Sequence, residues 1–228
     1  LNTPNIARPN LANYPYGKTK QQIASINVAY DFGDTVFRSI TGFVKTEDAF
    51  TNDFSGNGNV MASNIADAEQ LSEELQIQGS AINGKLNYLL GVYLFGEDAT
   101  QNFAWNSYLP GVLPILPVST SALKIKTTSV SAFTQLDYIL TDALKMTGGI
   151  RYTKDEKRFD MLFRGLLPPI TPATGLVDLD NAYSEISPRI GIDYKVASDN
   201  ENIDSMLLYA SVASGFKSGG YNGIAIFG

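Results

Sequence analysis

Apolar and polar residues alternate along most of the chain with the two-residue period of a β-strand. Helical periodicity is confined to a weak pattern at residues 63–73. The β pattern is found at residues 21–31, 35–49, 70–79, 85–96, 127–140, 144–158, 183–196 and 204–214. Several of these segments exceed an average strand of about five to six residues and reach the roughly nine to eleven that a tilted strand needs to cross a bilayer. The pattern therefore predicts an all-β protein with long strands.

The connections between these segments alternate between short and long. Short connections are expected at residues 32–34, 80–84, 141–143 and 197–203. Long loops, rich in Asn, Asp, Ser, Gly or Pro, are expected at residues 50–69, 97–126 and 159–182. Tight turns at one end and large loops at the other are typical of outer-membrane barrels. We therefore predict an antiparallel up-and-down transmembrane β-barrel segment, about eight strands of a larger barrel, with short periplasmic turns and long extracellular loops.

The two faces of the predicted strands differ in polarity. In residues 183–196 the even positions are mostly apolar and the odd positions mostly polar, and residues 144–153 follow the same rule. Residues 127–140 also sort in this way, although Phe133 and Ile139 are on the polar side, whereas residues 35–49 do not sort cleanly. A barrel with lipid outside and a polar interior requires this division. The candidate interior residues are Gln135, Asp137, Arg151, Arg189 and Asp193. We favour cross-strand pairing within the barrel wall over ligand contact for them, since a ligand touches few residues of a large barrel.

Four tyrosines on the apolar faces follow or precede a short turn by a few residues. They are Tyr30, Tyr88, Tyr138 and Tyr194. A phenol ring at the edge of the acyl chains keeps its hydroxyl among the headgroups, so these positions are typical of a membrane-interface aromatic girdle. Ordinary core tyrosines are the alternative interpretation, because tyrosine is common in any β-sheet.

The composition excludes most catalytic chemistry. The 228 residues include no histidine and no cysteine, which removes disulfides, imidazole or thiolate metal ligands and the usual nucleophile and base pairs. No acid and base pair with suitable spacing is present, so we predict no enzyme activity, no catalytic or metal site and no cofactor. The formal net charge of -6 leaves no basic field for nucleic acid.

Three segments in the second half of the chain resemble the barrel of TonB-dependent outer-membrane receptors. They are residues 147–153 (TGGIRYT), 187–194 (SPRIGIDY) and 208–212 (LYASV), the last continuing into 215–222 (GFKSGGYN). Residues 38–42 and 75–77 are compatible with the same family. The order of the three segments is more specific than any one of them, and the similarity extends over most of the chain.

The resemblance implies an outer-membrane protein of bacteria with roughly 22 strands and a lumen closed by an N-terminal plug. Such receptors import scarce nutrients, including ferric siderophores, with energy passed on by TonB. The implied partners are TonB, a small chelate or other nutrient, and outer-membrane lipid. We expect residues 1–228 to be a barrel segment of this kind, without a plug or a TonB box. With no histidine or cysteine, iron is expected to arrive as a chelate and not as a free ion.

Two other functions are compatible with parts of the pattern. Eight strands suffice for a small closed barrel with a structural or adhesion role, and its last strand would then pair with residues 21–31. A soluble β-rich carbohydrate-binding protein or hydrolase is the third hypothesis. The long strands and the alternation of short and long connections argue against it. If the receptor interpretation holds, the isolated chain is an open sheet with two unpaired edges and should aggregate or fail to insert into membranes. A monodisperse, heat-modifiable barrel formed by residues 1–228 alone would contradict that expectation.

Overall fold

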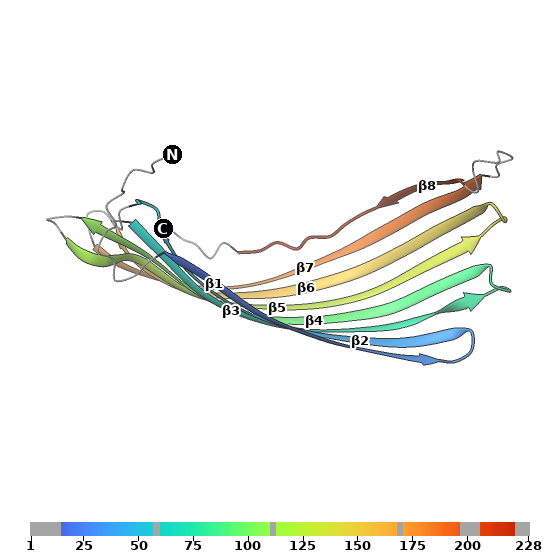
Figure 1. Ribbon diagram of the computed structural model, residues 1–228, viewed down its shortest axis with the longest axis horizontal. Helices are drawn as coiled ribbons and strands as arrows, with labels where there is room; N and C mark the ends of the chain where they lie inside the picture. Colours follow the sequence, from blue (N-terminus) through green and yellow to red (C-terminus); the bar gives the residue numbers. More distant parts are fainter. Residues whose placement is uncertain (1–14, 57–59, 110–112, 168–170, 197–205, 222–228) are drawn as a thin grey trace, which may run out of the picture.

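The computed structural model describes residues 15–56, 60–109, 113–167, 171–196 and 206–221. These residues form one curved sheet of eight strands (Figure 1), whose order in the sheet is the order in the chain. The strands are β1 (Tyr16–Asp31), β2 (Thr35–Asp53), β3 (Val60–Ala81), β4 (Leu86–Leu109), β5 (Leu113–Ile139), β6 (Leu144–Leu167), β7 (Thr171–Val196) and β8 (Met206–Ala213). Every neighbouring pair is antiparallel. The predicted all-β, up-and-down architecture is confirmed.

The strands extend far beyond the segments that the sequence pattern marked. β4 to β7 contain 24 to 27 residues each, and most of the predicted long loops at 50–69, 97–126 and 159–182 are strand. The weak helical pattern at 63–73 also lies within β3. Polar residues in these regions pair across strands, for example Lys45 with Glu69, so their polarity marks a wet part of the sheet and not a loop. The prediction of long loops was therefore wrong for most of these residues.

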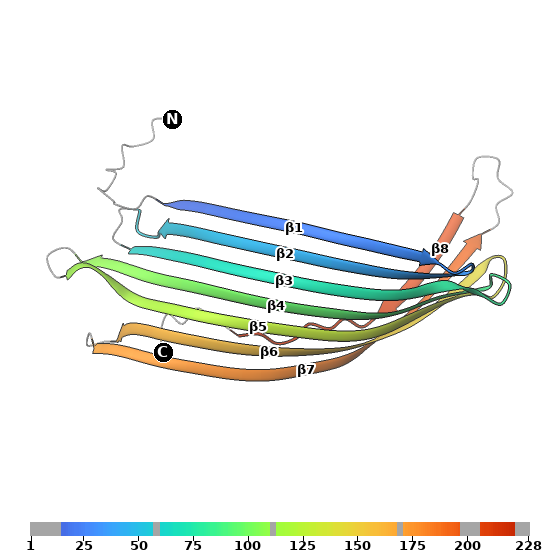
Figure 2. The same ribbon diagram turned by 90° about the horizontal axis from the view of Figure 1, so that it is seen from below.

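The short connections lie at one end of the sheet, which we call the turn end. The β1–β2 turn contains Gly33 at φ 76°, and the β3–β4 turn places Ile82, Asn83 and Gly84 at φ 54°, 54° and 81°. Positive φ is costly for Ile82, whose side chain is branched, so the tightness of this turn is imposed by the two strands that it joins. The predicted short connection at 197–203 lies outside the described residues. We call the opposite end the hairpin end (Figure 2).

The sheet is a single layer with a concave and a convex face. Odd-numbered residues of β5, β6 and β7 are on the concave face and are mostly half-buried or buried, whereas most even-numbered residues are exposed on the convex face. Large apolar side chains such as Leu90, Ile150 and Ile190 remain 47%, 49% and 59% exposed on the convex face. A soluble monomer rarely exposes so many apolar side chains together. The sheet therefore needs an apolar environment on its convex side.

A small core lies on the concave face toward the hairpin end. It consists of Leu123, Phe159 and Met161, which are at most 8% exposed. The segment after β8 leaves the edge of the sheet and crosses this face (Figure 1), so that the Tyr221 ring stacks on Phe159 with 5.0 Å between ring centroids. Lys157 Nζ donates a hydrogen bond of 2.8 Å to the carbonyl oxygen of Gly219 and fixes the crossing.

The sheet is open in the described part of the chain. β1 pairs only with β2, and β8 pairs only with β7 over residues 206–213. All of the residues of β1 and β8 are exposed. The pairing of the last strand with the first, which the small closed barrel requires, is not formed among these residues. Separately, no helix in the described ranges is long and apolar enough to cross a membrane.

Candidate functional site

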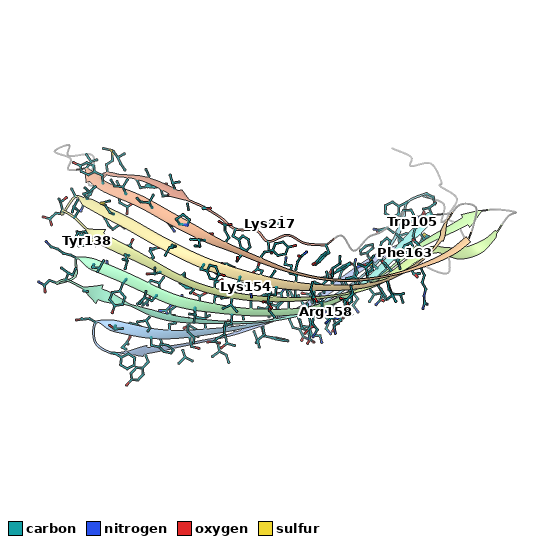
Figure 3. All side chains as sticks on the ribbon, turned by 180° about the vertical axis from the view of Figure 1, so that it is seen from behind. Trp105, Tyr138, Lys154, Arg158, Phe163 and Lys217 are labelled. Carbon is teal, nitrogen blue, oxygen red and sulfur yellow. The ribbon has the colours of Figure 1, made fainter. Side chains whose placement is uncertain are left out.

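The five candidate interior residues share the concave face. Gln135 and Asp137 are on β5, Arg151 on β6, and Arg189 and Asp193 on β7, all at odd positions. Side chains project from both faces of the sheet along the strands (Figure 3). The predicted division into a polar and an apolar face is therefore present in these strands. The structure brings some of the five together and separates others.

Arg151 has the most elaborate surroundings of the five. Its Nη2 donates to Ser131 Oγ at 2.9 Å and its Nε to Thr153 Oγ1 at 3.2 Å. The guanidinium also lies over two aromatic rings, with 5.6 Å to the centroid of Tyr93 and 5.4 Å to that of Phe133. Cation–π contacts of this kind hold an arginine in place without neutralising it. In the described part of the chain no carboxylate is within ion-pair distance of Arg151.

Phe133, one of the two apolar exceptions on the polar side of its strand, lies beside Arg151. Its ring lies on Gly91 of β4, where a Cβ atom would overlap three ring carbons. The register pairs Gly91 with Phe133 and Phe133 with Arg151. A glycine therefore makes room for the ring, and the ring supports the guanidinium. Reading β5 alone could not reveal this arrangement, because it depends on both neighbouring strands.

A polar cluster lies on the concave face at the turn end. Asp137 accepts hydrogen bonds from Thr147 Oγ1 at 2.5 Å and Gln135 Nε2 at 3.1 Å. These residues border a groove of about 490 Å³ whose lining includes Gln135 and Asp137. Asp193 forms an ion pair of 2.6 Å with Lys145. The sequence pattern put Thr147 and Lys145 on the polar face but could not show that they meet Asp137 and Asp193, since only the register shows which residues face each other across strands.

Two further arginines are on the concave face. Arg189 is exposed there and has no ion pair among the described residues. Arg38, which did not fit the alternation in residues 35–49, shares this face with Val36, Ile40 and Val44. The Nε atom of Arg38 is buried and has no hydrogen-bond partner among the described residues. The irregular segment thus places a cation on the same face as the other polar residues.

The four tyrosines are all on the convex face, near the turn end. Tyr88 donates to or accepts from Thr35 Oγ1 at 2.7 Å, and its ring covers Gly79. When the cross-strand pairs are followed from β1 to β4, Tyr30 is aligned with Leu90, which is two residues from Tyr88. The same displacement of two residues, always toward the turn end, separates Tyr88 from Tyr138 and Tyr138 from Tyr194. The tyrosines therefore follow a line that shifts by six residues over the six steps from β1 to β7.

The exposed apolar side chains of the convex face, such as Leu90, Ile150 and Ile190, form what we call the apolar stripe. Charged residues of the same face lie between this stripe and the hairpin end. They form ion pairs between Lys20 and Glu47, Lys45 and Glu69, Lys126 and Asp98, and Lys154 and Glu156, and from Arg158 to both Asp160 and Asp178. Their separations are 2.6 to 3.5 Å, and the side chains are exposed. Exposed pairs contribute little to stability individually. Their common level marks a sharp boundary between apolar and charged surface.

The pair of Lys45 and Glu69 supports a prediction for high pH. The hydrogen bond and the charge of Glu69 raise the pKa of Lys45 in the folded state. The pair therefore stabilises fully below the unfolded-state pKa of about 10.4 and loses its effect as pH rises through the raised folded-state pKa. We expect Lys45→Gln to lower the unfolding midpoint at pH 8 and to have little effect at the highest pH that the protein tolerates. Lys18→Gln on β1 serves as a control, and an equal Lys45→Gln effect at both pH values would contradict the assignment.

Glu73 interrupts the apolar stripe of the convex face. It lies on β3 between Leu71 and Leu75, and its two carboxylate oxygens accept hydrogen bonds from Ser39 Oγ at 2.6 Å and Thr41 Oγ1 at 2.5 Å. Both donors are on the adjacent strand β2. The two hydroxyls reduce the cost of placing a carboxylate on an otherwise apolar surface.

A model of the family described as "TonB dependent receptor-like, beta-barrel" matches residues 1–227. The chain belongs to this family. The family and the solved structures similar to it are transport receptors and not enzymes, which confirms the prediction of no enzyme activity. None of the curated proteins compared with this chain matches it.

Solved structures of receptors share the fold of this TonB-dependent receptor barrel. The ferric yersiniabactin uptake receptor FyuA from Yersinia pestis has a TM-score of 0.76 and 19% identity, over 94% of this chain and 31% of that protein. The ferric-catecholate import receptor Fiu from E. coli K12, in its open form, has a TM-score of 0.57 and 15% identity, over 88% and 36%. The ferric citrate transporter FecA has a TM-score of 0.57 and 13% identity, over 87% and 27%. The chain thus spans about a third of the length of these receptors.

Proposed function

We propose that the complete protein containing this chain is an outer-membrane receptor that imports a ferric siderophore or a similar chelate with energy from TonB. The observation that carries the proposal is the family match over residues 1–227. The similar folds belong to receptors for ferric yersiniabactin, ferric catecholate and ferric citrate. The shared cargo of those proteins is chelated iron, which agrees with a chain that contains no histidine or cysteine to capture a free ion.

In this proposal the convex face contacts lipid and the concave face lines the interior. The tyrosine line supports this orientation. A shift of one residue per strand, with about 3.3 Å per residue and about 4.8 Å between strands, corresponds to a strand tilt of about 35°. Outer-membrane barrels have tilts of about 35–45°. Tyr30, Tyr88, Tyr138 and Tyr194 would then lie at one depth, at the periplasmic interface.

The interior residues receive roles that follow from their contacts. Gln135, Asp137 and Asp193 belong to hydrogen-bonded or ion-paired wall clusters. Arg151 is fixed by its neighbours but keeps three of the five N–H donors of a guanidinium free of the two hydrogen bonds described above. Arg151 and Arg189 are therefore the residues of this set that we expect to face an anionic occupant of the interior.

Uptake of labelled iron tests the function. The complete gene is expressed in a bacterial strain that lacks its own ferric-chelate receptors, and uptake of radioactive iron is measured with hydroxamate, catecholate, phenolate and citrate chelates. We expect uptake of at least one chelate in a strain with TonB and none above background in the same strain without TonB. Uptake that is independent of TonB, or no uptake of any chelate by a correctly inserted receptor, would contradict the proposal.

The isolated chain provides a second test of the barrel assignment. The described part of residues 1–228 has unpaired edges at β1, at β8 and along the part of β7 that β8 does not cover, and a bilayer does not tolerate such edges. We expect refolding of this chain into detergent or lipid vesicles to give aggregates, measured by gel filtration and by the heat-dependent mobility of folded barrels in electrophoresis. A single monodisperse species with such a mobility shift would favour the small closed barrel instead.

A further inference from the structure

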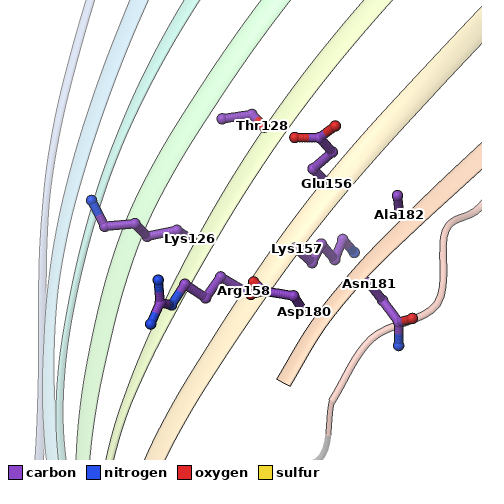
Figure 4. A pocket seen from close by; sticks show the side chains of 8 residues that line it. All are labelled: Lys126, Thr128, Glu156, Lys157, Arg158, Asp180, Asn181 and Ala182. Carbon is purple, nitrogen blue, oxygen red and sulfur yellow. The ribbon is translucent and has the colours of Figure 1, made fainter. Parts of the chain in front are cut away.

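A groove of about 530 Å³ lies on the convex face, at the boundary between apolar and charged surface (Figure 4). It spans β5, β6 and β7, and its lining consists of Lys126, Thr128, Glu156, Lys157, Arg158, Asp180, Asn181 and Ala182. Lys157 differs from the other cations, because its ammonium binds the Gly219 carbonyl on the concave face. The cationic side chains available to the groove are therefore Lys126 and Arg158.

These two cations face each other directly across neighbouring strands. The register pairs Lys126 of β5 with Arg158 of β6. Like charges in directly opposed positions destabilise a sheet unless an anion lies between or beside them. The same row continues to Asp98 on one side and Asp180 on the other. Its order across four strands is therefore acid, base, base, acid, with the positive charge concentrated in the centre.

The carboxylates that now contact the two cations are weak competitors for an external anion. Lys126 is 3.1 Å from Asp98, and Arg158 is 3.5 Å from Asp160 and 3.4 Å from Asp178. Both cationic side chains are 52% exposed. Ion pairs with such exposure are worth little in water, whereas a phosphate offers a higher charge and several acceptor oxygens to the same groups.

The surface next to the groove is suited to acyl chains. Toward the turn end, Val130, Tyr152 and Ile186 are on the convex face of β5, β6 and β7 and are 54%, 47% and 54% exposed, and on β6 Lys154, ion-paired with Glu156, lies between Tyr152 and Arg158. A ligand that joins a phosphate to hydrocarbon chains could therefore place each part on matching surface. Free phosphate would use only the groove.

We propose that this groove binds the phosphate-bearing headgroup of a lipid in the outer leaflet, with its acyl chains on the adjoining apolar stripe. The inference rests on the membrane orientation in the proposed function. Lys126 and Arg158 hold the phosphate, and Glu156 and Asp180 at the rim hydrogen-bond hydroxyl or ammonium groups of the headgroup. A cationic site at this depth fixes the vertical position of β5 to β7 in the bilayer.

Native mass spectrometry of the complete receptor tests the proposal. The receptor is reconstituted in phosphatidylcholine vesicles containing phosphatidic acid, and the phosphatidic acid molecules retained after extraction are counted. The variants are Lys126→Gln, Arg158→Gln and the double variant. Lys45→Gln is the matched control, because Lys45 is also an ion-paired cation of the charged boundary but lies on β2, outside the groove.

The wild-type receptor and Lys45→Gln should retain phosphatidic acid selectively. The double variant should retain about tenfold less phosphatidic acid than the wild type, as expected for the loss of charge-assisted hydrogen bonds. Equal retention by the double variant and the wild type would overturn the site. Equal losses of phosphatidic acid for Lys45→Gln and the groove variants would show that retention depends on general surface charge, which would also overturn the site. Displacement of phosphatidic acid by millimolar inorganic phosphate would show that the groove binds free phosphate, which would overturn the assignment of a lipid as the ligand. If the receptor inserts into the vesicles but retains no phosphatidic acid, only the proposed lipid site is contradicted. If the receptor does not insert, the proposed function is contradicted as well.

Discussion

Thr134→Arg should lower the free energy of unfolding of the complete receptor in a bilayer by about 2–4 kcal/mol, the cost of an arginine on the lipid face near the bilayer midplane. Thr134 is on the convex face of β5, midway between Val130 and Tyr138. Its cross-strand neighbours on that face are Leu90 and Ile150, which are 47% and 49% exposed. A guanidinium at this position has only apolar groups or lipid around it, and its long side chain reaches water at neither boundary without bending.

Gln135→Arg is the matched control for that prediction. Gln135 is the next residue of the same strand, at almost the same depth, but it is on the concave face beside Asp137. An arginine there has a carboxylate within reach and a polar interior around it, so the expected loss is much smaller. Urea unfolding of the receptor in lipid vesicles measures both variants. Equal losses for Thr134→Arg and Gln135→Arg would show that the two faces do not differ in environment, and the lipid-facing assignment would be wrong.

Gly91→Ala should destabilise the receptor by about 1–3 kcal/mol, the usual cost of forcing an extra methyl group into a packed site. A Cβ atom at residue 91 would overlap the ring of Phe133. Phe133 must then move, and Arg151 loses one of the two rings that support its guanidinium. The consequence should extend beyond packing, because Arg151 would also shift relative to Ser131 and to any anion in the interior.

Gly148→Ala separates this effect from the general consequence of replacing a glycine in a strand. Gly148 is on β6, and a Cβ atom there would meet no other atom within 4 Å. Alanine at that position should be neutral or slightly stabilising, since it reduces the flexibility of the unfolded chain. Combining Gly91→Ala with Phe133→Leu should cost less than the sum of the two single changes, because the smaller side chain vacates the overlapping space. Additive losses would contradict the proposed contact.

Much of the fold could be predicted from local pattern. The alternation in residues 144–153 and 183–196 depends on whether each position faces lipid or the interior, and a period of two has only one structural meaning in an extended chain. Gln135, Arg151 and Arg189 are all at odd positions, which puts them on one face of the sheet. The number and order of the strands followed from the turns, because Gly33 and Gly84 have the positive φ that short connections require.

The lengths of the strands could not be predicted in the same way. In the proposed orientation Lys45, Glu69, Asp98 and Lys126 lie outside the membrane, where both faces of a strand are wet, so these parts of the strands show no clear alternation even though they pair in the sheet. Such residues also occur in loops, which made residues 50–69 and 97–126 resemble loops. The backbone hydrogen bonds that extend these strands carry no signature in the side chains.

The sequence by itself determined the class of fold, the two faces and the family resemblance, because these depend on the order of residues along one strand at a time. Only the tertiary structure decided which residues meet across strands, including Arg151 with Tyr93 and Phe133, and Lys126 with Arg158. The physical reason is register: sliding one strand past its neighbour by two residues keeps every side chain on its face but changes every cross-strand partner. The candidate sites of this protein are built from such partners, and they therefore appear only when the strands are assembled.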